Sequence, residues 1–161
     1  MIIGPFIDGY TIPSGTTTAM ASNAIPYALI NGVADPVPVL GPSPDYIDVR
    51  DAARAHVLAL RAPRGPSNER KRLPLSGGPL PWAEAGPYLR EVRPALSERL
   101  PPSGKLLPPG TAPPAGMDSS RALKVLQITE LTDWKLALIE TVDDLLRVEA
   151  SWAAASSMES T

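Results

Sequence analysis

His56 is the only histidine of the chain and its only conventional general base near neutral pH. It falls in residues 52–62, which are predicted to form a helix, with Ala52 and Ala59 beside it on the helix surface. No Gly-x-Ser-x-Gly turn accompanies it, so nothing supports the nucleophile of a serine hydrolase. A packing or surface role for His56 is therefore favoured over catalysis.

Three charged residues lie just before or at the start of this helix. Asp48 and Asp51 are three positions apart, and paired carboxylates can in principle act as acid and base. A surface carboxylate for Asp48 and a helix N-cap for Asp51 are the favoured roles. Arg50 is the best functional candidate of the three, although a structural ion pair is favoured over a functional contact for it as well. No residue of the chain is assigned as catalytic.

The composition excludes several kinds of chemistry. The 161 residues include no cysteine and one histidine, which excludes disulfides, thiolate catalysis and cysteine or multi-histidine metal sites. A net charge of −2 provides no basic field for nucleic acid. No apolar run approaches the roughly 20 residues of a membrane span, and no basic residue precedes Arg50 as a secretory signal would require. We expect a cytoplasmic protein without a metal, nucleic-acid or membrane partner.

The elements that position these residues follow from hydrophobic patterns and turn residues. Proline accounts for 20 of the 161 residues, which predicts long loops, chiefly 33–45 and 101–116. The predicted strands are 1–3, 46–49 and 72–75, the last at an edge because of Pro74. The predicted helices are 23–31, 52–62, 82–92, 118–126 and 131–152. Trp134 and Trp152 are predicted to pack on the core face of the last helix.

This order of elements is an α/β pattern. Three short strands do not make a self-sufficient parallel sheet with both faces covered. Partners for these strands are therefore expected from elsewhere.

One ungapped run carries a family resemblance: Tyr46-Ile47-Asp48-Val49-Arg50-Asp51-Ala52-Ala53-Arg54-Ala55-His56. It resembles the (Y/F)-V-D-V-R-D-V-A-x-A-H block of extended short-chain dehydrogenases, in the NAD-dependent epimerase/dehydratase superfamily. The nearest branch contains dihydroflavonol and cinnamoyl-CoA reductases and fungal methylglyoxal-reductase-like carbonyl reductases.

Further matches follow in the order of that family and span residues 1 to about 152. They are Ile2-Ile3-Gly4-Pro5-Phe6, Asn31-Gly32, Arg72-Leu73-Pro74-Leu75-Ser76-Gly77, Asp118-Ser119-Ser120-Arg121-Ala122-Leu123-Lys124-Val125-Leu126 and Thr141-Val142-Asp143-Asp144-Leu145-Leu146. Gln127 stands where the family usually has glycine.

The resemblance implies an α/β fold, the loop-rich C-terminal part of an NAD(P)-binding Rossmann-type reductase with the N-terminal cofactor-binding strands missing. Residues 1–152 would be the substrate-side portion, followed by a disordered tail at 153–161. The family binds NADP or NAD at a glycine-rich turn and protonates the carbonyl with a Tyr-x-x-x-Lys pair. Neither motif occurs here. No residue is therefore assigned to the cofactor, and neither NADPH nor NADH is expected to bind this chain alone.

By the same resemblance, Tyr46 and the loop 33–45 would border the substrate cleft. Arg50 becomes a substrate-side candidate because, in relatives that act on nucleotide sugars, an arginine near this region contacts substrate phosphates. The function implied is a fragment or remnant of an oxidoreductase that reduces a small ketone or aldehyde, inactive by itself. The alternative is a non-catalytic protein that pairs with another subunit or a full-length paralogue. The sequence does not distinguish these two functions from each other. It also does not distinguish NADPH from NADH as the cofactor of the family.

Overall fold

The computed structural model describes residues 1–7, 10–13, 16–32, 45–62, 72–102, 106 and 116–159. Its elements are β1 (Ile2–Ile3), η1 (Thr17–Asn23), α1 (Ala24–Ile30), β2 (Asp45–Asp48), α3 (Val49–Arg61), β3 (Gly78–Pro79), α4 (Trp82–Val92), η2 (Pro94–Leu96), α5 (Ser120–Leu126) and α6 (Trp134–Glu159). Among these described residues, no helix is both long and apolar enough to cross a membrane.

A small sheet lies at the centre of the structure, with strand order β1-β2-β3. β1 pairs with β2 in parallel, with Ile2 opposite Ile47 and Ile3 opposite Asp48. β3 pairs with β2 in the antiparallel sense. Because side chains alternate along a strand, Ile3 and Asp48 share one face and are both fully buried. Ile2 and Ile47 share the other face, where Ile2 is 47% exposed.

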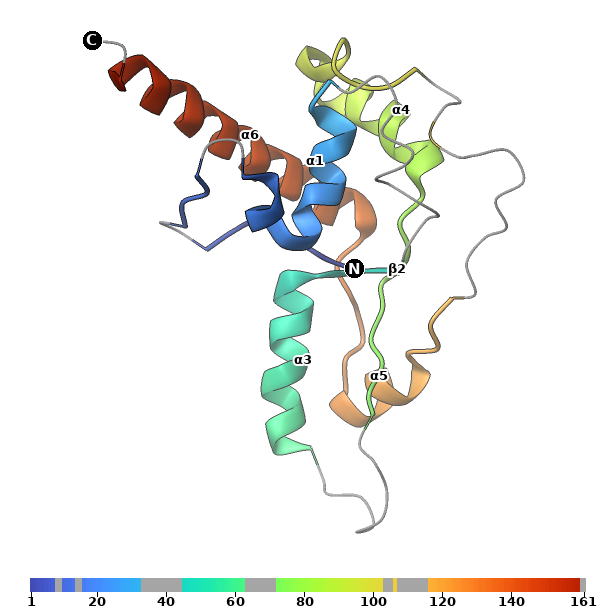
Figure 1. The fold of residues 1–161 in the computed structure, drawn as a ribbon. Helices are drawn as coiled ribbons and strands as arrows, with labels where there is room; N and C mark the ends of the chain where they lie inside the picture. Colours follow the sequence, from blue (N-terminus) through green and yellow to red (C-terminus); the bar gives the residue numbers. More distant parts are fainter. Residues whose placement is uncertain are drawn as a thin grey trace.

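Helices cover the two sides of this sheet unequally (Figure 1). α1, α4 and α6 gather on one side, around a core that includes Ile3, Trp82 and Leu138. α3 and α5 lie on the other side, where a much smaller cluster is built on Ala55, Leu126 and Ile128. The second side is therefore the thinly packed one.

The strand predicted at 72–75 is wrong. Residues 72–77 are not part of a strand, and the chain joins the sheet only at Gly78 and Pro79. The side chains of Leu73 and Leu75 pack against the small cluster beside α3 and α5. Pro74 offers no N–H to a ladder, and no strand among the described residues pairs with residues 72–75.

The long C-terminal helix α6 buries the predicted apolar face, with Leu138, Val142 and Leu145 fully buried. Glu149 lies on the same face and is paired: it accepts hydrogen bonds from the Tyr27 hydroxyl (2.8 Å) and from the Arg99 guanidinium (2.7 Å). Trp134 and Trp152 both pack against the main core, as predicted.

The structure differs from the predicted disordered tail. α6 continues through residue 159, with exposed side chains at 153–157, while residues 160–161 lie outside the described part. Three consecutive alanines, residues 153–155, have the highest helix propensity, and this favours continuation of the helix beyond the packed region.

Candidate functional site

The carboxyl ends of the parallel strands β1 and β2 lie side by side. Gly4, Pro5 and Phe6 follow β1, whereas Val49 and Arg50 follow β2. In open α/β sheets, ligands bind in the crevice outside the carboxyl ends of the strands. Two hollows open at this end: one of 250 Å³ between β1 and η1, and one of 380 Å³ between Arg50 and α6. Pro5 lines both, so we call them together the strand-end crevice.

Asp48 builds the β2 side of the crevice by capping α3. Its fully buried carboxylate accepts the backbone N–H of Arg50 at 2.8 Å, as an N-cap side chain does. The helix therefore begins at Val49, and the prediction that Asp51 is its N-cap is wrong. A capping carboxylate satisfies an N–H at the second or third helical position, and from Asp48 that N–H belongs to Arg50.

Arg50 is held over the crevice by two carboxylates. Its guanidinium donates to both oxygens of Asp48 at 2.8 Å and forms an ion pair with Glu140 of α6 at 2.5 Å. Its side chain nevertheless remains 49% exposed and lines the 380 Å³ hollow. Burial raises the pKa of the Asp48 carboxyl, but the hydrogen bonds from Arg50 outweigh it and hold that pKa below its ordinary value.

Asp51 links α3 to the segment that leads into α6. Its carboxylate accepts the backbone N–H of Thr132 at 2.6 Å and pairs with Arg54 at 3.0 Å. The residue is 6% exposed and lines neither hollow. Asp48 and Asp51 are thus each occupied by structural donors, on different sides of the α3 N-terminus.

Tyr46 is not brought to the crevice. It is 3% exposed, and its hydroxyl donates to the carbonyl oxygen of Thr132 at 2.7 Å. Burial, followed by the charges of Asp133, Asp51 and Asp48, raises the pKa of Tyr46 to about 12. Of the two substrate-side candidates, only Arg50 reaches an open hollow. The loop 33–45, also predicted to border the cleft, lies outside the described residues up to 44.

The 250 Å³ hollow contains residues that sequence reasoning did not single out as a site. Its lining is mainly apolar, with Phe6 and Tyr10 stacked at a ring-centroid distance of 5.3 Å and with Met20 buried beside them. Ser22 and Asn23 are polar residues of this lining, and Asn23 is the buried one of the two. The amide of Asn23 donates to the carbonyl of Gly4 at 2.8 Å, and its Oδ1 is buried without a donor among the described residues.

Backbone strain lies at the same hollow. Ala21, which lines it, has φ 50° and ψ −130°, a combination that side-chain-bearing residues rarely adopt. Such outliers cluster at ligand sites and persist only where the surrounding structure enforces them. No pattern in the sequence signals this conformation, because alanine has no preference for positive φ.

The crevice does not fit a dinucleotide pyrophosphate. A phosphate cradle needs glycines that let the backbone approach the ligand at a helix N-terminus. Gly4 is the glycine of this crevice, and the space beside its Cα is filled, because a Cβ built there would clash with Cγ1 of Val49. The described residues also contain no cluster of three or more His, Cys, Asp or Glu side chains that could hold a metal ion.

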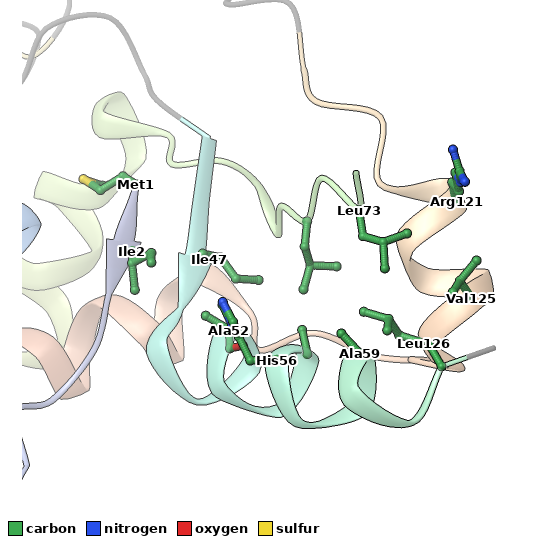
Figure 2. Close-up of a pocket in the computed structure, with 13 residues that line it drawn as sticks. Met1, Ile2, Ile47, Ala52, His56, Ala59, Leu73, Arg121, Val125 and Leu126 are labelled. Carbon is green, nitrogen blue, oxygen red and sulfur yellow. The ribbon is translucent and has the colours of Figure 1, made fainter. Parts of the chain in front are cut away.

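A separate apolar groove lies on the thinly packed side of the molecule (Figure 2). Its volume is 610 Å³, and it extends from Met1 and Ile2 along α3 to α5. Its lining is Met1, Ile2, Ile47, Ala52, Ala55, His56, Ala59, Ala62, Leu73, Leu75, Arg121, Val125 and Leu126. The exposed His56 points Nδ1 at the carbonyl of Ala52, 2.7 Å away, a contact within its own helix.

The sequence matches no family model and no curated protein. Solved structures are nevertheless similar in fold. The crystal structure of yeast methylglyoxal/isovaleraldehyde reductase Gre2 complexed with NADPH matches 92% of this chain and 45% of its own, with a TM-score of 0.54 and 19% identity. The Candida albicans Gre2 structure in complex with NADPH matches 92% and 42%, with a TM-score of 0.63 and 17% identity.

The structural likeness to these two reductases establishes the fold of the chain. The chain is an α/β protein with the fold of a part of Rossmann-type reductases, and the predicted fold class is confirmed. It spans less than half the length of either reductase.

Proposed function

We propose that this chain is the substrate-side part of an NAD(P)-dependent reductase of the extended short-chain dehydrogenase family, in the branch of fungal carbonyl reductases. The observation that carries the proposal is the strand-end crevice, placed where α/β folds bind ligands, in a chain whose fold matches NADPH-bound reductases over 92% of its length. The reaction is hydride transfer from the bound nicotinamide to a small ketone or aldehyde.

The residues of the crevice support a substrate-side role. The apolar wall with Phe6, Tyr10 and Met20 suits the carbon chain of a small carbonyl compound, because apolar pockets with few polar groups are typical ligand sites. Arg50 adds a half-exposed cation whose position is held by Asp48 and Glu140. In this proposal the chain orients the substrate, while the proton donor and the dinucleotide cradle belong to a part of the reductase outside this sequence. The chain by itself is then inactive and binds neither NADPH nor NADH.

The second candidate is a non-catalytic protein that pairs with another subunit or a full-length paralogue. The 610 Å³ groove favours it, since the groove is lined mainly by aliphatic side chains that apolar side chains of a partner can contact.

A chimera distinguishes the two candidates. The dinucleotide-binding segment of the yeast reductase is joined ahead of Met1, and NADPH consumption is followed with methylglyoxal and with isovaleraldehyde. The proposed function expects turnover by the chimera and none by either part alone. A chimera that binds NADPH but reduces neither carbonyl rejects the reductase proposal and leaves the pairing role.

A further inference from the structure

The chain that follows β1 is held at two points by the long helix α6. At the first point, the backbone N–H of Phe6 donates to Oδ2 of Asp144 at 2.6 Å. At the second, the indole N–H of Trp152 donates to the carbonyl oxygen of Ile12 at 2.5 Å. Asp144 and Trp152 are eight positions apart on one helix, so the two points are about 12 Å apart along its axis. Figure 1 shows the N-terminal part of the chain, in dark blue, beside α6.

The stacked rings of Phe6 and Tyr10, which we call the aromatic wall, belong to this part of the chain. Both line the 250 Å³ hollow of the strand-end crevice. Tyr10 is 43% exposed and Ile7 is 81% exposed, so burial in the core fixes neither of them. The N–H of Tyr10 donates to the carbonyl of Ile7 at 3.0 Å, a bond within the same short stretch. The position of the aromatic wall therefore depends on the two points at which α6 holds the chain.

Trp152 is an anchor whose own position is fixed. Its ring packs against the main core and meets the ring of Tyr27 edge-on, with the centroids 6.2 Å apart. The Tyr27 hydroxyl donates to Glu149 at 2.8 Å, and two nitrogens of Arg99 donate to that carboxylate at 2.7 and 2.9 Å. The indole N–H can only donate, and the carbonyl of Ile12 satisfies it. Because Ile12 is itself 4% exposed, this contact fixes the far end of the chain that carries the aromatic wall.

Asp144 is the second anchor, and its side chain is 11% exposed. Its Oδ1 accepts from Nε of Arg147 at 2.8 Å, while Oδ2 accepts the N–H of Phe6. Hydrogen bonds from a backbone N–H to a carboxylate are stronger than those between neutral groups. A backbone donor also cannot rotate away as a side chain can. The contact with Asp144 therefore fixes Phe6 relative to α6.

We propose that Asp144 and Trp152 are positioning residues that hold the aromatic wall against the apolar chain of the carbonyl substrate and set a preference for branched chains over short ones. This rests on the proposed function, in which the 250 Å³ hollow receives that chain. Neither residue lines this hollow, so both act through Phe6 and Tyr10. A wall held at both ends stays in contact with a branched chain, whereas a loose wall loses part of that contact to water.

The first measurement follows the aromatic wall in the chain itself. Trp152→Phe removes the indole N–H and keeps an aromatic ring in its place. It is expected to speed amide hydrogen exchange at Tyr10 by about tenfold, because exchange reports the free energy of local opening. Trp134→Phe is the matched control and should leave this exchange unchanged. Trp134 lies on the same helix and packs against the same core, but its ring contacts Tyr88 instead of the chain that follows β1.

The second measurement is the selectivity of the chimeric reductase, taken as kcat/KM for isovaleraldehyde divided by kcat/KM for methylglyoxal. Trp152→Phe is expected to lower this ratio by about tenfold, mainly by raising KM for the branched isovaleraldehyde. Asp144→Ala should also lower the ratio. Asp144→Asn should keep it, because the amide oxygen can still accept the N–H of Phe6. A variant that only loses stability lowers both values of kcat/KM by the same factor and leaves the ratio unchanged.

Three results overturn the proposal. They are unchanged exchange at Tyr10 in Trp152→Phe, an unchanged ratio in Trp152→Phe, and a fall in the ratio that is equally large in Trp134→Phe. If Asp144→Ala does not fold, the two tryptophan variants still decide between these outcomes. A chimera that binds NADPH but reduces neither compound rejects the proposed function. The exchange at Tyr10 in the chain itself then decides whether α6 positions the aromatic wall.

Discussion

The carboxylate of Asp48 makes three hydrogen bonds to Arg50, one to the backbone N–H and two to the guanidinium, all at 2.8 Å. The same two residues therefore form both the N-cap of α3 and the ion pair that holds the guanidinium. The carboxylate starts α3 and at the same time fixes the cation that lines the strand-end crevice. A change at Asp48 therefore alters both the stability of the helix and the position of Arg50.

Asp48→Ala is expected to lower the free energy of unfolding by about 1–3 kcal/mol, because an N-cap and a buried acceptor for a charged donor are lost together. Asp51→Ala also removes a buried acceptor, that of the Thr132 N–H, but leaves the cap intact. Urea unfolding of both variants measures the difference. A helix content that falls more in the Asp51 variant than in the Asp48 variant would contradict the assignment of Asp48 as the cap.

Arg50→Ala is expected to raise KM of the chimeric reductase for its carbonyl substrate by about tenfold, corresponding to roughly 1.4 kcal/mol, and to change kcat little. Arg50→Lys keeps the positive charge and is expected to restore part of the affinity. It does not restore the bidentate contact with Asp48. Arg93→Ala is the control, because Arg93 pairs with Asp143 at 2.6 Å and lines neither hollow. An equal effect of Arg93→Ala on KM would show that Arg50 acts only through the stability of the protein.

The chain is expected to lose stability in acid through Asp48 and Glu149. Burial raises the pKa of each carboxyl, but hydrogen bonds from Arg50 and from Arg99 with Tyr27, respectively, outweigh it and hold both pKa values below the ordinary 3.8 and 4.5. A depressed folded pKa stabilises the protein above the unfolded value, and this contribution disappears as the pH falls through the folded value.

Thermal melts from pH 6 down to about pH 2 test this expectation. Asp48→Asn should flatten the dependence below pH 4, because the variant has one fewer carboxyl to protonate. An acid dependence identical to that of the unsubstituted chain would show that Asp48 does not contribute to it.

Gly77→Ala is expected to destabilise the chain by about 1–3 kcal/mol. A Cβ at Gly77 would lie 2.7 Å from Cζ of Tyr46, whose ring is buried and whose hydroxyl is bonded to Thr132. Gly116→Ala is the matched control, because nothing lies within 4 Å of a Cβ built there. Urea unfolding should separate the two variants. Equal stability would mean that Tyr46 can move aside at little cost.

The sequence by itself determined the elements whose signals are local. The helix at Trp82–Val92 follows its predicted bounds, and the apolar spacing of Leu138, Val142 and Leu145 identified the buried face of α6. Asn31-Gly32 marked the end of α1 at Ile30, because glycine accommodates the left-handed turn that ends a helix. The run at Tyr46–His56 identified the strand-to-helix junction and the fold class.

Only the tertiary structure decided which residues of that junction do what. The sequence favoured Asp51 as the cap and a surface position for Asp48. The structure differs because the buried Asp48 accepts the Arg50 N–H, whereas Asp51 accepts the backbone N–H of Thr132, 81 positions away in sequence. The same holds for Tyr46, which is buried and whose hydroxyl donates to the carbonyl oxygen of Thr132. The segment 72–75 carried the composition of a strand, but a strand exists only when another backbone lies beside it. Long-range partners of this kind leave no trace in local patterns, because hydrogen bonding and burial depend on which distant segments the fold brings together.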